Sequence, residues 1–431
     1  MHYIADVNLA FDSLRMIMRE VPFGWLLRYF HLNGASLFFL AVYLHMGKNI
    51  FYGSYLAPRY KIWLSGLIVY ILLVATAFFG YVLPWGQMSY WGATVISGLI
   101  STIPIFGQFL LTIIWGGENI TTITLRRFYT LHFLFPFIIL IVMFIHLIFL
   151  HEEGSNNPMG FNSQDNIILH IFYSIKDLLV IYCFFALFLF FIFYLPTFLG
   201  NPVNALIADV NFTPKKMVPE WYFLPMYTIL RSINSRGGGV LLLAGFFMLL
   251  FSLPFLTNPM IKSGDLKLFF NYIFQIIITV FIILGWAGSK SLDDFWIFAS
   301  RLFTSLFFIA FLAFLPLTEV LNSFIVYYRV DYYLKKEAFN LFFNLGKDFL
   351  SLHSFDLSYL TRQKKDYLKL ILNNCDIIDE YKDATSLTDK DDAMWNAWYF
   401  GESKYNLIYA EDEFNFLLDK LFPTDSEKYY K

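Results

Sequence analysis

The sequence predicts an all-α membrane protein: a transmembrane helical bundle with about seven spans, followed by a soluble C-terminal extension. Hydrophobic residues make up 58% of the 431 residues and charged residues only 15%, whereas soluble chains carry about 25% charged residues. Between residues 30 and 325 the apolar residues gather into stretches of about 20, the length that a helix needs to cross the hydrocarbon core. After about residue 335 charged side chains become frequent, interleaved with aromatic ones.

Seven apolar stretches are the candidates for these spans. They cover residues 30–50, 62–83, 128–150, 178–199, 239–257, 268–287 and 297–325, here numbered spans one to seven. The apolar segment 85–115 is interrupted by glycines and a proline, so we expect short helices at the membrane interface there rather than another span. Residues 201–239 are rich in proline, asparagine and charges and contain Pro-Glu-Trp-Tyr. That composition predicts a long loop, of a kind that is usually functional.

The same boundaries suggest three parts of the chain. Residues 1–200 contain the first four spans, residues 201–334 contain the long loop and the last three spans, and residues 335–431 form a polar extension of unknown role. The net charge of −2 does not suggest a polyanionic partner, so we expect no nucleic-acid binding. The only two cysteines are too few for a disulfide framework or a cysteine metal site.

Four of the eight histidines lie in predicted spans and form two pairs with the same spacing. His31 and His45 are 14 residues apart in span one, and His132 and His146 are 14 apart in span three. Fourteen residues are nearly four helical turns, so the members of each pair share one helix face about 21 Å apart along the axis. If spans one and three run in the same direction, His31 faces His132 at one depth and His45 faces His146 at another.

Two facing imidazoles at each depth most simply hold a haem iron, because a porphyrin supplies four nitrogens whereas zinc needs further protein ligands. The sequence has no Cys-x-x-Cys-His, so such haems are non-covalent and b-type. The alternatives are a polar residue satisfied by its neighbours at each position, or a haem-free ion transporter or structural bundle that uses its histidines as an ion relay. A single intramembrane histidine leaves this choice open, but the repeated spacing favours two haems.

Other residues recur near these histidines. Gly66 and Gly80 in span two are also 14 residues apart, so a porphyrin could pack on them, although small residues also serve close helix packing. Arg28 and Arg127 precede His31 and His132 near the ends of their spans, and Lys48 follows His45. We expect these three cations to pair with haem propionates or to extend towards the interface.

Several stretches identify a family. They are RYFHLNGAS (28–36), YLHMG (43–47), ATAFFGYVLPWGQMSYWGATVI (75–96), FLHEEGSNNP (149–158), YSIKD (173–177) and PEWYFL (219–224). Through them, residues 1 to about 330 closely resemble cytochrome b of ubiquinol:cytochrome c oxidoreductase, respiratory complex III. The family has a further helix before the residues with which this chain begins, and we expect a separate or preceding segment to supply it.

The resemblance implies a topology, which the distribution of lysine and arginine leaves equivocal. The His31/His132 haem is then the low-potential one near the outer face, and the His45/His146 haem the high-potential one near the inner face. The long loop lies outside and the extension inside. In the chloroplast counterpart of this family the two halves are separate chains, whereas here they are fused.

The resemblance also implies two quinone sites. At the outer site ubiquinol is oxidised, and Glu220, a lone carboxylate among apolar residues, should have a raised pKa and accept a quinol proton; a salt bridge or cap within the loop is its alternative role. Further positions that match the lining of this outer pocket are Tyr81, Tyr227, Phe78, Pro219 and Gly92. The inner site, where ubiquinone is reduced, maps to His151, Ser155, Lys176 and Asp177.

The function implied is that of the dihaem catalytic subunit of a proton-translocating oxidoreductase in the mitochondrial inner membrane. One electron of each quinol passes to a partner and the other crosses the membrane, which is a Q cycle. The implied partners are the Rieske iron-sulfur protein, cytochrome c1 and other complex III subunits in a homodimeric complex, within a lipid bilayer. We expect the extension 335–431 to contact other subunits or a neighbouring complex.

Overall fold

The computed structural model of the chain is an elongated bundle of helices. It describes residues 2–324, except 159, 161–166, 257–261, 263, 265, 266 and 268. The predicted extension 335–431 lies outside the described residues. In the described part the only β-pairing is an isolated bridge between Gly86 and Ile207, so the all-α prediction is confirmed.

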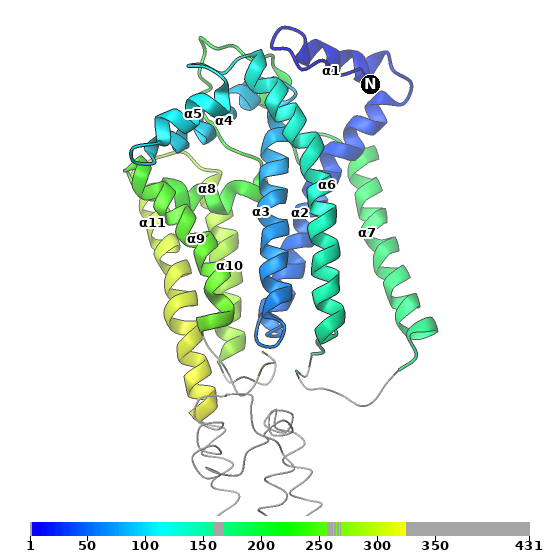
Figure 1. Ribbon diagram of the computed structural model, residues 1–431, viewed down its shortest axis with the longest axis vertical. Coiled ribbons are helices and arrows are strands. Elements are labelled where there is room, and N and C mark those ends of the chain that lie inside the picture. Colours follow the sequence, from blue (N-terminus) through cyan, green and yellow to red (C-terminus); the bar gives the residue numbers. More distant parts are fainter. Residues whose placement is uncertain are drawn as a thin grey trace, which may run out of the picture.

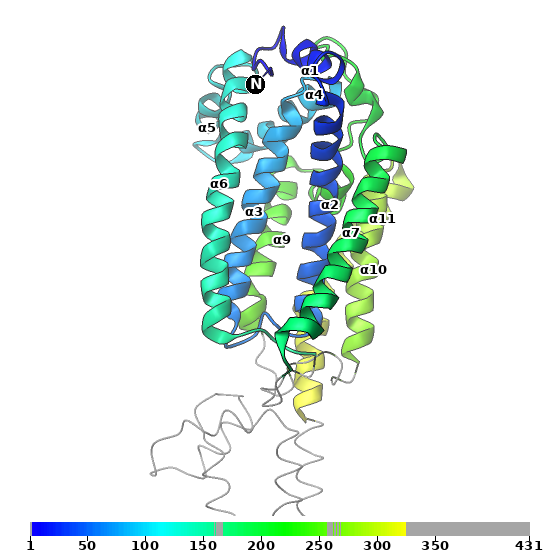
Figure 2. The same cartoon turned by 90° about the vertical axis from the view of Figure 1, so that its right-hand side faces the viewer.

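Seven long helices of the described part correspond to the seven predicted spans. They are α2 (Gly24–Phe51), α3 (Tyr60–Val82), α6 (Thr122–Glu153), α7 (Ser174–Tyr194), α9 (Arg236–Leu256), α10 (Phe270–Gly288) and α11 (Asp294–Ile309). All except α2 belong to segments that are long and apolar enough to cross a membrane; the segment of α11 continues to Phe324. α2 has 28 residues but includes two histidines, two asparagines and two cations. It nevertheless runs beside α3 in both views of the bundle (Figures 1 and 2).

The helices form two groups. α2, α3, α6 and α7 make up one side of the bundle, and α8 to α11 the other (Figure 1). α2 and α6 run in the same direction and α3 runs in the opposite one; in the view of Figure 2, α3 appears between them. The largest apolar core joins the two groups: Trp63 and Leu67 of α3 pack in one cluster with Phe246 of α9, Leu284 of α10 and Phe311. α3 therefore packs against helices of both groups.

The start of α6 is fixed by its sequence. The Thr121 side chain accepts a hydrogen bond from the Ile123 amide at 3.3 Å, and the Thr124 hydroxyl accepts one from the Thr121 amide at 3.1 Å. This reciprocal cap satisfies amides that the first helical turn leaves unpaired. Because the cap sets where the helix begins, it also sets the depth at which His132 and His146 lie.

The predicted interfacial segment consists of short helices, as expected. α4 (Gln87–Gly98), a 3₁₀ turn (Leu99–Thr102) and α5 (Gly107–Trp115) lie across one end of the bundle (Figure 1). Gln87 joins this segment to the long loop, because its side-chain amide donates to the Phe212 carbonyl at 2.9 Å and accepts from the Asp209 amide at 2.8 Å. The two segments predicted to form the outer pocket are thus held together.

The loop prediction for residues 201–239 was wrong at two places. Leu224–Arg231 form helix α8, and α9 begins at Arg236, inside the predicted loop. Pro225 stands in the first turn of α8, where its missing N–H costs nothing. Thr228 is fully buried and its hydroxyl donates to the Leu284 carbonyl of α10 at 2.6 Å. Tertiary packing against α10 therefore stabilises a helix that local composition did not predict.

A buried ion pair connects the residues just before α10 with the segment that continues α11, and it gives a testable prediction. Lys267 Nζ lies 2.6 Å from Glu319 Oε1, and the two side chains are 1% and 3% exposed. We expect Glu319→Ala to destabilise the protein by roughly 3–5 kcal/mol, because it leaves a buried ammonium without its carboxylate. Thermal unfolding in detergent measures the loss. The double variant Lys267→Met, Glu319→Leu should recover most of it, and a Glu319→Ala protein as stable as the parent would contradict the prediction.

Candidate functional site

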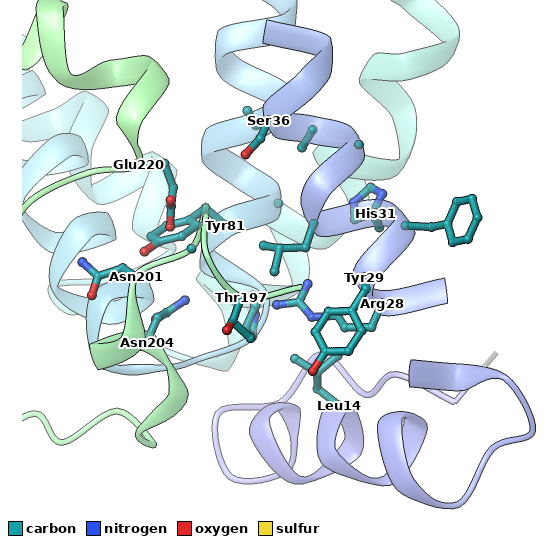
Figure 3. A pocket seen from close by; sticks show the side chains of 18 of the residues that line it. Leu14, Arg28, Tyr29, His31, Ser36, Tyr81, Thr197, Asn201, Asn204 and Glu220 are labelled. Carbon is teal, nitrogen blue, oxygen red and sulfur yellow. The ribbon is translucent and has the colours of Figure 1, made fainter. Parts of the chain in front are cut away.

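A large cavity opens at the end of the bundle that α1 (Ala10–Arg19) covers. Its volume is about 1590 Å³, and α1, α2, α3, α6 and the segment 197–207 line it. The side chains in Figure 3 come from separate parts of the chain and converge on this space. The predicted site residues that line it are Arg28, His31, Gly80, Tyr81, His132 and Glu220.

His31 of α2 and His132 of α6 face one another in this cavity. Their ring centroids are 5.9 Å apart and the rings are inclined by 81°. Two imidazoles bound to one metal ion through bonds of about 2 Å have centroids roughly 6 Å apart. His132 Nδ1 lies 2.8 Å from the Thr76 carbonyl oxygen, to which it donates, so Nε2 is left for a metal, the arrangement that metal-binding histidines usually have.

Gly80 makes room for the His132 ring. A Cβ atom at residue 80 would approach the Cε1 atom of His132 and come within 2.7 Å of its Nδ1 and 3.0 Å of its Nε2. The Cβ of residue 66 would lie 3.1 Å from Cε1 of His146. The two glycines of α3 are therefore spaced like the histidines because each clears space for a histidine ring of α6.

These clearances predict the effect of adding one methyl group. We expect Gly80→Ala to displace the His132 ring and lower the haem content of the purified protein, and Gly66→Ala to have a smaller effect because its contact is longer. Gly98→Ala is the matched control, since a Cβ there would meet nothing within 4 Å. The pyridine haemochrome assay, expressed per chain, measures the outcome. Equal haem content in all three variants would contradict this role for the glycines.

A second cavity of about 430 Å³ lies deeper along the same helices. His45, Lys48, Gly66, His146 and Ser155 line it among other residues. His146 Nδ1 lies 2.9 Å from the Ser65 hydroxyl oxygen, and His45 Nε2 lies 3.3 Å from the side-chain nitrogen of Asn49. The second predicted histidine pair therefore shares a cavity with Lys48 and Ser155, two other residues that the sequence singled out.

Glu220 precedes a short 3₁₀ turn (Trp221–Phe223) and is 8% exposed. Burial raises the pKa of its carboxyl group, and Tyr81, the Asn201 backbone and Arg28 partly offset that rise. The Tyr81 side chain lies against the carboxylate (Figure 3), and its hydroxyl is one of the groups that favour the ionised form. A carboxyl group with a raised pKa and the Tyr81 side chain beside it therefore line the same cavity.

Some predicted residues lie elsewhere. Tyr227 donates to the Met217 carbonyl at 3.1 Å, and Phe78 packs against Phe79 and Phe128. The Arg127 guanidinium is bound to the carbonyls of Ile113 and Ile114 at the end of α5. Neither these three residues nor Pro219 and Gly92 line the large cavity.

The predicted inner-site residues are only partly brought together. Ser155 lines the second cavity, whereas His151, Lys176 and Asp177 do not. His151 lies near the end of α6 and is exposed; Lys176 and Asp177 lie in the first turn of α7, with Lys176 Nζ 5.6 Å from the Tyr173 ring centroid. These ends of α6 and α7 are at the same end of the bundle (Figure 1).

Three residues at the site were not predicted from the sequence. Thr76 and Ser65 contact the two histidines of α6, and Asn204 accepts hydrogen bonds from the amide (2.8 Å) and hydroxyl (3.0 Å) of Ser89 beside Tyr81. The position of Ser65 directly before Gly66 was a usable signal. Asn204 acts through a long-range contact and the Thr76 contact is a backbone carbonyl, so neither left a pattern in the sequence.

Comparisons with known proteins agree with this geometry. The model of the family "Cytochrome b/b6/petB" matches residues 1–154, and that of "Cytochrome b(C-terminal)/b6/petD" matches residues 207–308. Cytochrome b of Rickettsia prowazekii (strain Madrid E) is 47% identical over 320 residues, which are 74% of this chain and 80% of the relative. The chain belongs to the cytochrome b family.

Other cytochrome b relatives and a solved structure extend the match. Cytochrome b of Cyanidium caldarium is 43% identical over 332 residues, 77% of this chain and 86% of the relative. A chain of a hyperthermophilic respiratory complex III superposes with a TM-score of 0.71 at 33% identity, over 74% of this chain and 86% of that chain. As a cytochrome b, the chain is a multi-pass membrane component of a respiratory oxidoreductase complex, with b-type haem and partner subunits.

The residues present fit b-type haem. In the described ranges no group of three or more His, Cys, Asp or Glu side chains could hold a metal ion, so each histidine pair offers two ligands and a porphyrin would have to supply the rest. Nδ1 of His132 and of His146 already has a partner, which leaves Nε2 for the iron. Arg28, a cation that could pair with a propionate, lines the same cavity as His31 and His132.

Proposed function

We propose that this cytochrome b is the dihaem catalytic subunit of a ubiquinol:cytochrome c oxidoreductase. In this proposal it oxidises ubiquinol beside Glu220 and reduces ubiquinone near Ser155. The supporting observation is that α2 and α6 present two histidine pairs in two cavities at two depths, and that the cavity of one pair also contains Glu220. Haem irons held by His31 with His132 and by His45 with His146 would supply one-electron chemistry at low and high potential respectively.

At the outer site Glu220 is the proposed acceptor of the quinol proton, and Tyr81 and Arg28 lie beside it. A buried carboxylate with a raised pKa is matched to accepting a proton from a bound quinol near neutral pH. The Tyr81 side chain lies beside it in the same cavity, where its hydroxyl would bind a quinol oxygen. Arg28 faces both Glu220 and His31 in the cavity, so its charge favours the ionised carboxylate while its guanidinium can hold a propionate.

At the inner site we propose Ser155, His151, Lys176 and Asp177 as the groups that bind ubiquinone and deliver its protons. Ser155 lines the cavity of His45 and His146. The segment before Ser155 is held by a cation, since Arg59 Nε donates to the Gly154 carbonyl at 3.1 Å. His151 and Asp177 are exposed at the same end of the bundle, which is where the proposal needs them.

The proposed setting is the mitochondrial inner membrane, in a homodimeric complex with a Rieske iron-sulfur protein and cytochrome c1. The first partner would take one electron of each quinol, while the second electron crosses the membrane and completes a Q cycle. The outer site would then lie at the end of the bundle where α4 contacts the long loop, and this end would receive the Rieske protein.

A redox spectrum of the purified complex tests the proposal. We expect two b-type absorption bands that become reduced at separate potentials, with two haems for each copy of this chain. A complex without b-type bands would leave the haem-free transporter or structural bundle as the better description, and a single haem per chain would contradict the dihaem function.

A further inference from the structure

The two histidines of α6 contact α3 in different ways. His132 Nδ1 donates to a backbone carbonyl, that of Thr76, over 2.8 Å. His146 Nδ1 instead meets a side-chain hydroxyl, that of Ser65, over 2.9 Å. The ring of each histidine lies against a glycine of α3, so the two sites share that feature. The partner of Nδ1 is therefore a specific difference between the two sites.

The sequence of α3 explains this difference. Ile62 stands 14 residues before Thr76, so its carbonyl has the same relation to His146 as the Thr76 carbonyl has to His132. Ser65 also binds that carbonyl, because its hydroxyl donates to the Ile62 oxygen over 2.9 Å. The residue 14 positions after Ser65 is Phe79, which has no hydroxyl. Only the second site therefore has a hydroxyl that contacts both the histidine and the carbonyl.

The hydrogen bond from Ser65 to Ile62 indicates which ring nitrogen of His146 carries the proton. A serine hydroxyl has one hydrogen to donate, and here that hydrogen is directed to the Ile62 carbonyl. Ser65 Oγ can then only accept from His146, so Nδ1 carries the ring proton and Nε2 has the free lone pair that an iron needs. Ser65 is 5% exposed, and burial keeps water from competing for this contact.

We infer that Ser65 is a positioning residue that fixes the metal-binding tautomer of His146 and raises the reduction potential of the haem bound there. The inference rests on the proposed function. A hydroxyl is a weaker hydrogen-bond acceptor than an amide carbonyl, so it draws less on the N–H proton and leaves the imidazole a poorer electron donor. A poorer donor stabilises ferric iron less, and hydrogen bonding to the ligand is one of the means by which proteins tune haem potential.

Replacement of Ser65 in the intact complex tests the inference. In Ser65→Ala the hydroxyl is lost, and the Ile62 carbonyl, which already lies within interaction distance of His146, remains as the acceptor of the N–H. We expect the midpoint potential of the His45/His146 haem to fall towards that of the His31/His132 haem, whose own potential stays constant. Haem content per chain is the second readout, and a selective loss of the His45/His146 haem would also support the role.

Two further variants of Ser65 distinguish the effect of the hydroxyl from the effect of side-chain shape. Ser65→Thr and Ser65→Val have side chains of nearly the same form, so only the hydroxyl distinguishes them, and the threonine variant should have the higher potential. Ser252→Ala is the control on α9, because the Ser252 hydroxyl also donates to a carbonyl three residues earlier, at 2.8 Å, and lines neither cavity. It should leave both haems unchanged.

Three results would overturn the inference: equal potentials in the threonine and valine variants, an unchanged potential in Ser65→Ala, or equal shifts of both haems. Absence of b-type haem from the parent complex would overturn the proposed function as well, which distinguishes the two failures. Redox potentiometry followed at the absorption band of each haem gives all of these readings, and none of them depends on turnover.

Discussion

His132→Leu is expected to remove one b-type haem from the complex and to leave the other in place. His132 lies with His31 in the large cavity, whereas His45 and His146 line the second one, so the variant deletes a ligand at one depth only. The pyridine haemochrome assay should find half of the parental haem per chain. Quinol oxidation that depends on electron transfer across the chain should fall to background, because the remaining site is too far along the helix to replace the lost one.

The control for this variant is His170→Leu. His170 is exposed, lies outside both cavities, and its Nδ1 is 3.3 Å from the Ser174 hydroxyl. Both haems should remain in that variant. Loss of both haems from His132→Leu in an otherwise assembled complex would contradict the independence of the two sites, and retention of both would show that His132 is not a ligand.

Glu220→Gln is expected to slow quinol oxidation by about 10²-fold or more, the usual contribution of a positioned general base. The amide has nearly the shape of the carboxylic acid but cannot accept a proton. Because burial raises the pKa of Glu220, the parental rate should increase with pH through a range above that of an ordinary carboxyl group, as the carboxylate form becomes populated. The variant should lose this increase.

The rate is measured as cytochrome c reduction at saturating quinol over a series of pH values. Glu118→Gln is the control, since Glu118 is an exposed carboxylate in the segment between α5 and α6 and is not among the residues that line the large cavity. A parental pH dependence retained in Glu220→Gln would assign the proton transfer to another group. An unchanged rate would remove Glu220 from the reaction altogether.

Hydropathy and spacing were sufficient to predict the bundle and the histidine pairs. The spans are apolar over their whole length because lipid or protein surrounds every face, and such runs are visible in a sequence. The pairing of His31 with His132 followed from a 14-residue repeat, since helical geometry is regular enough to convert residue spacing into depth. The structure places those two rings 5.9 Å apart.

Contacts that depend on tertiary packing were less predictable. α8 was predicted as loop because proline and asparagine dominate the surrounding residues, yet the bond from Thr228 to α10 and the packing around it stabilise a helix there. Arg127 has the position in sequence of a propionate ligand but is bound to carbonyls at the end of α5. A flexible cation can reach several partners, and the sequence does not contain the distance that selects among them.

α3 contains none of the four histidines, but the spacing of its two glycines has to match the spacing of the two histidines of α6. Gly66 and Gly80 clear the two rings, and one inserted or deleted residue between them would turn one clearance away from α6 by about 100°. Insertions and deletions should therefore be absent from this stretch among working relatives, while the loops at both ends of α3 remain free to vary in length. Between the two glycines, substitutions can accumulate during evolution, but the number of residues should stay constant.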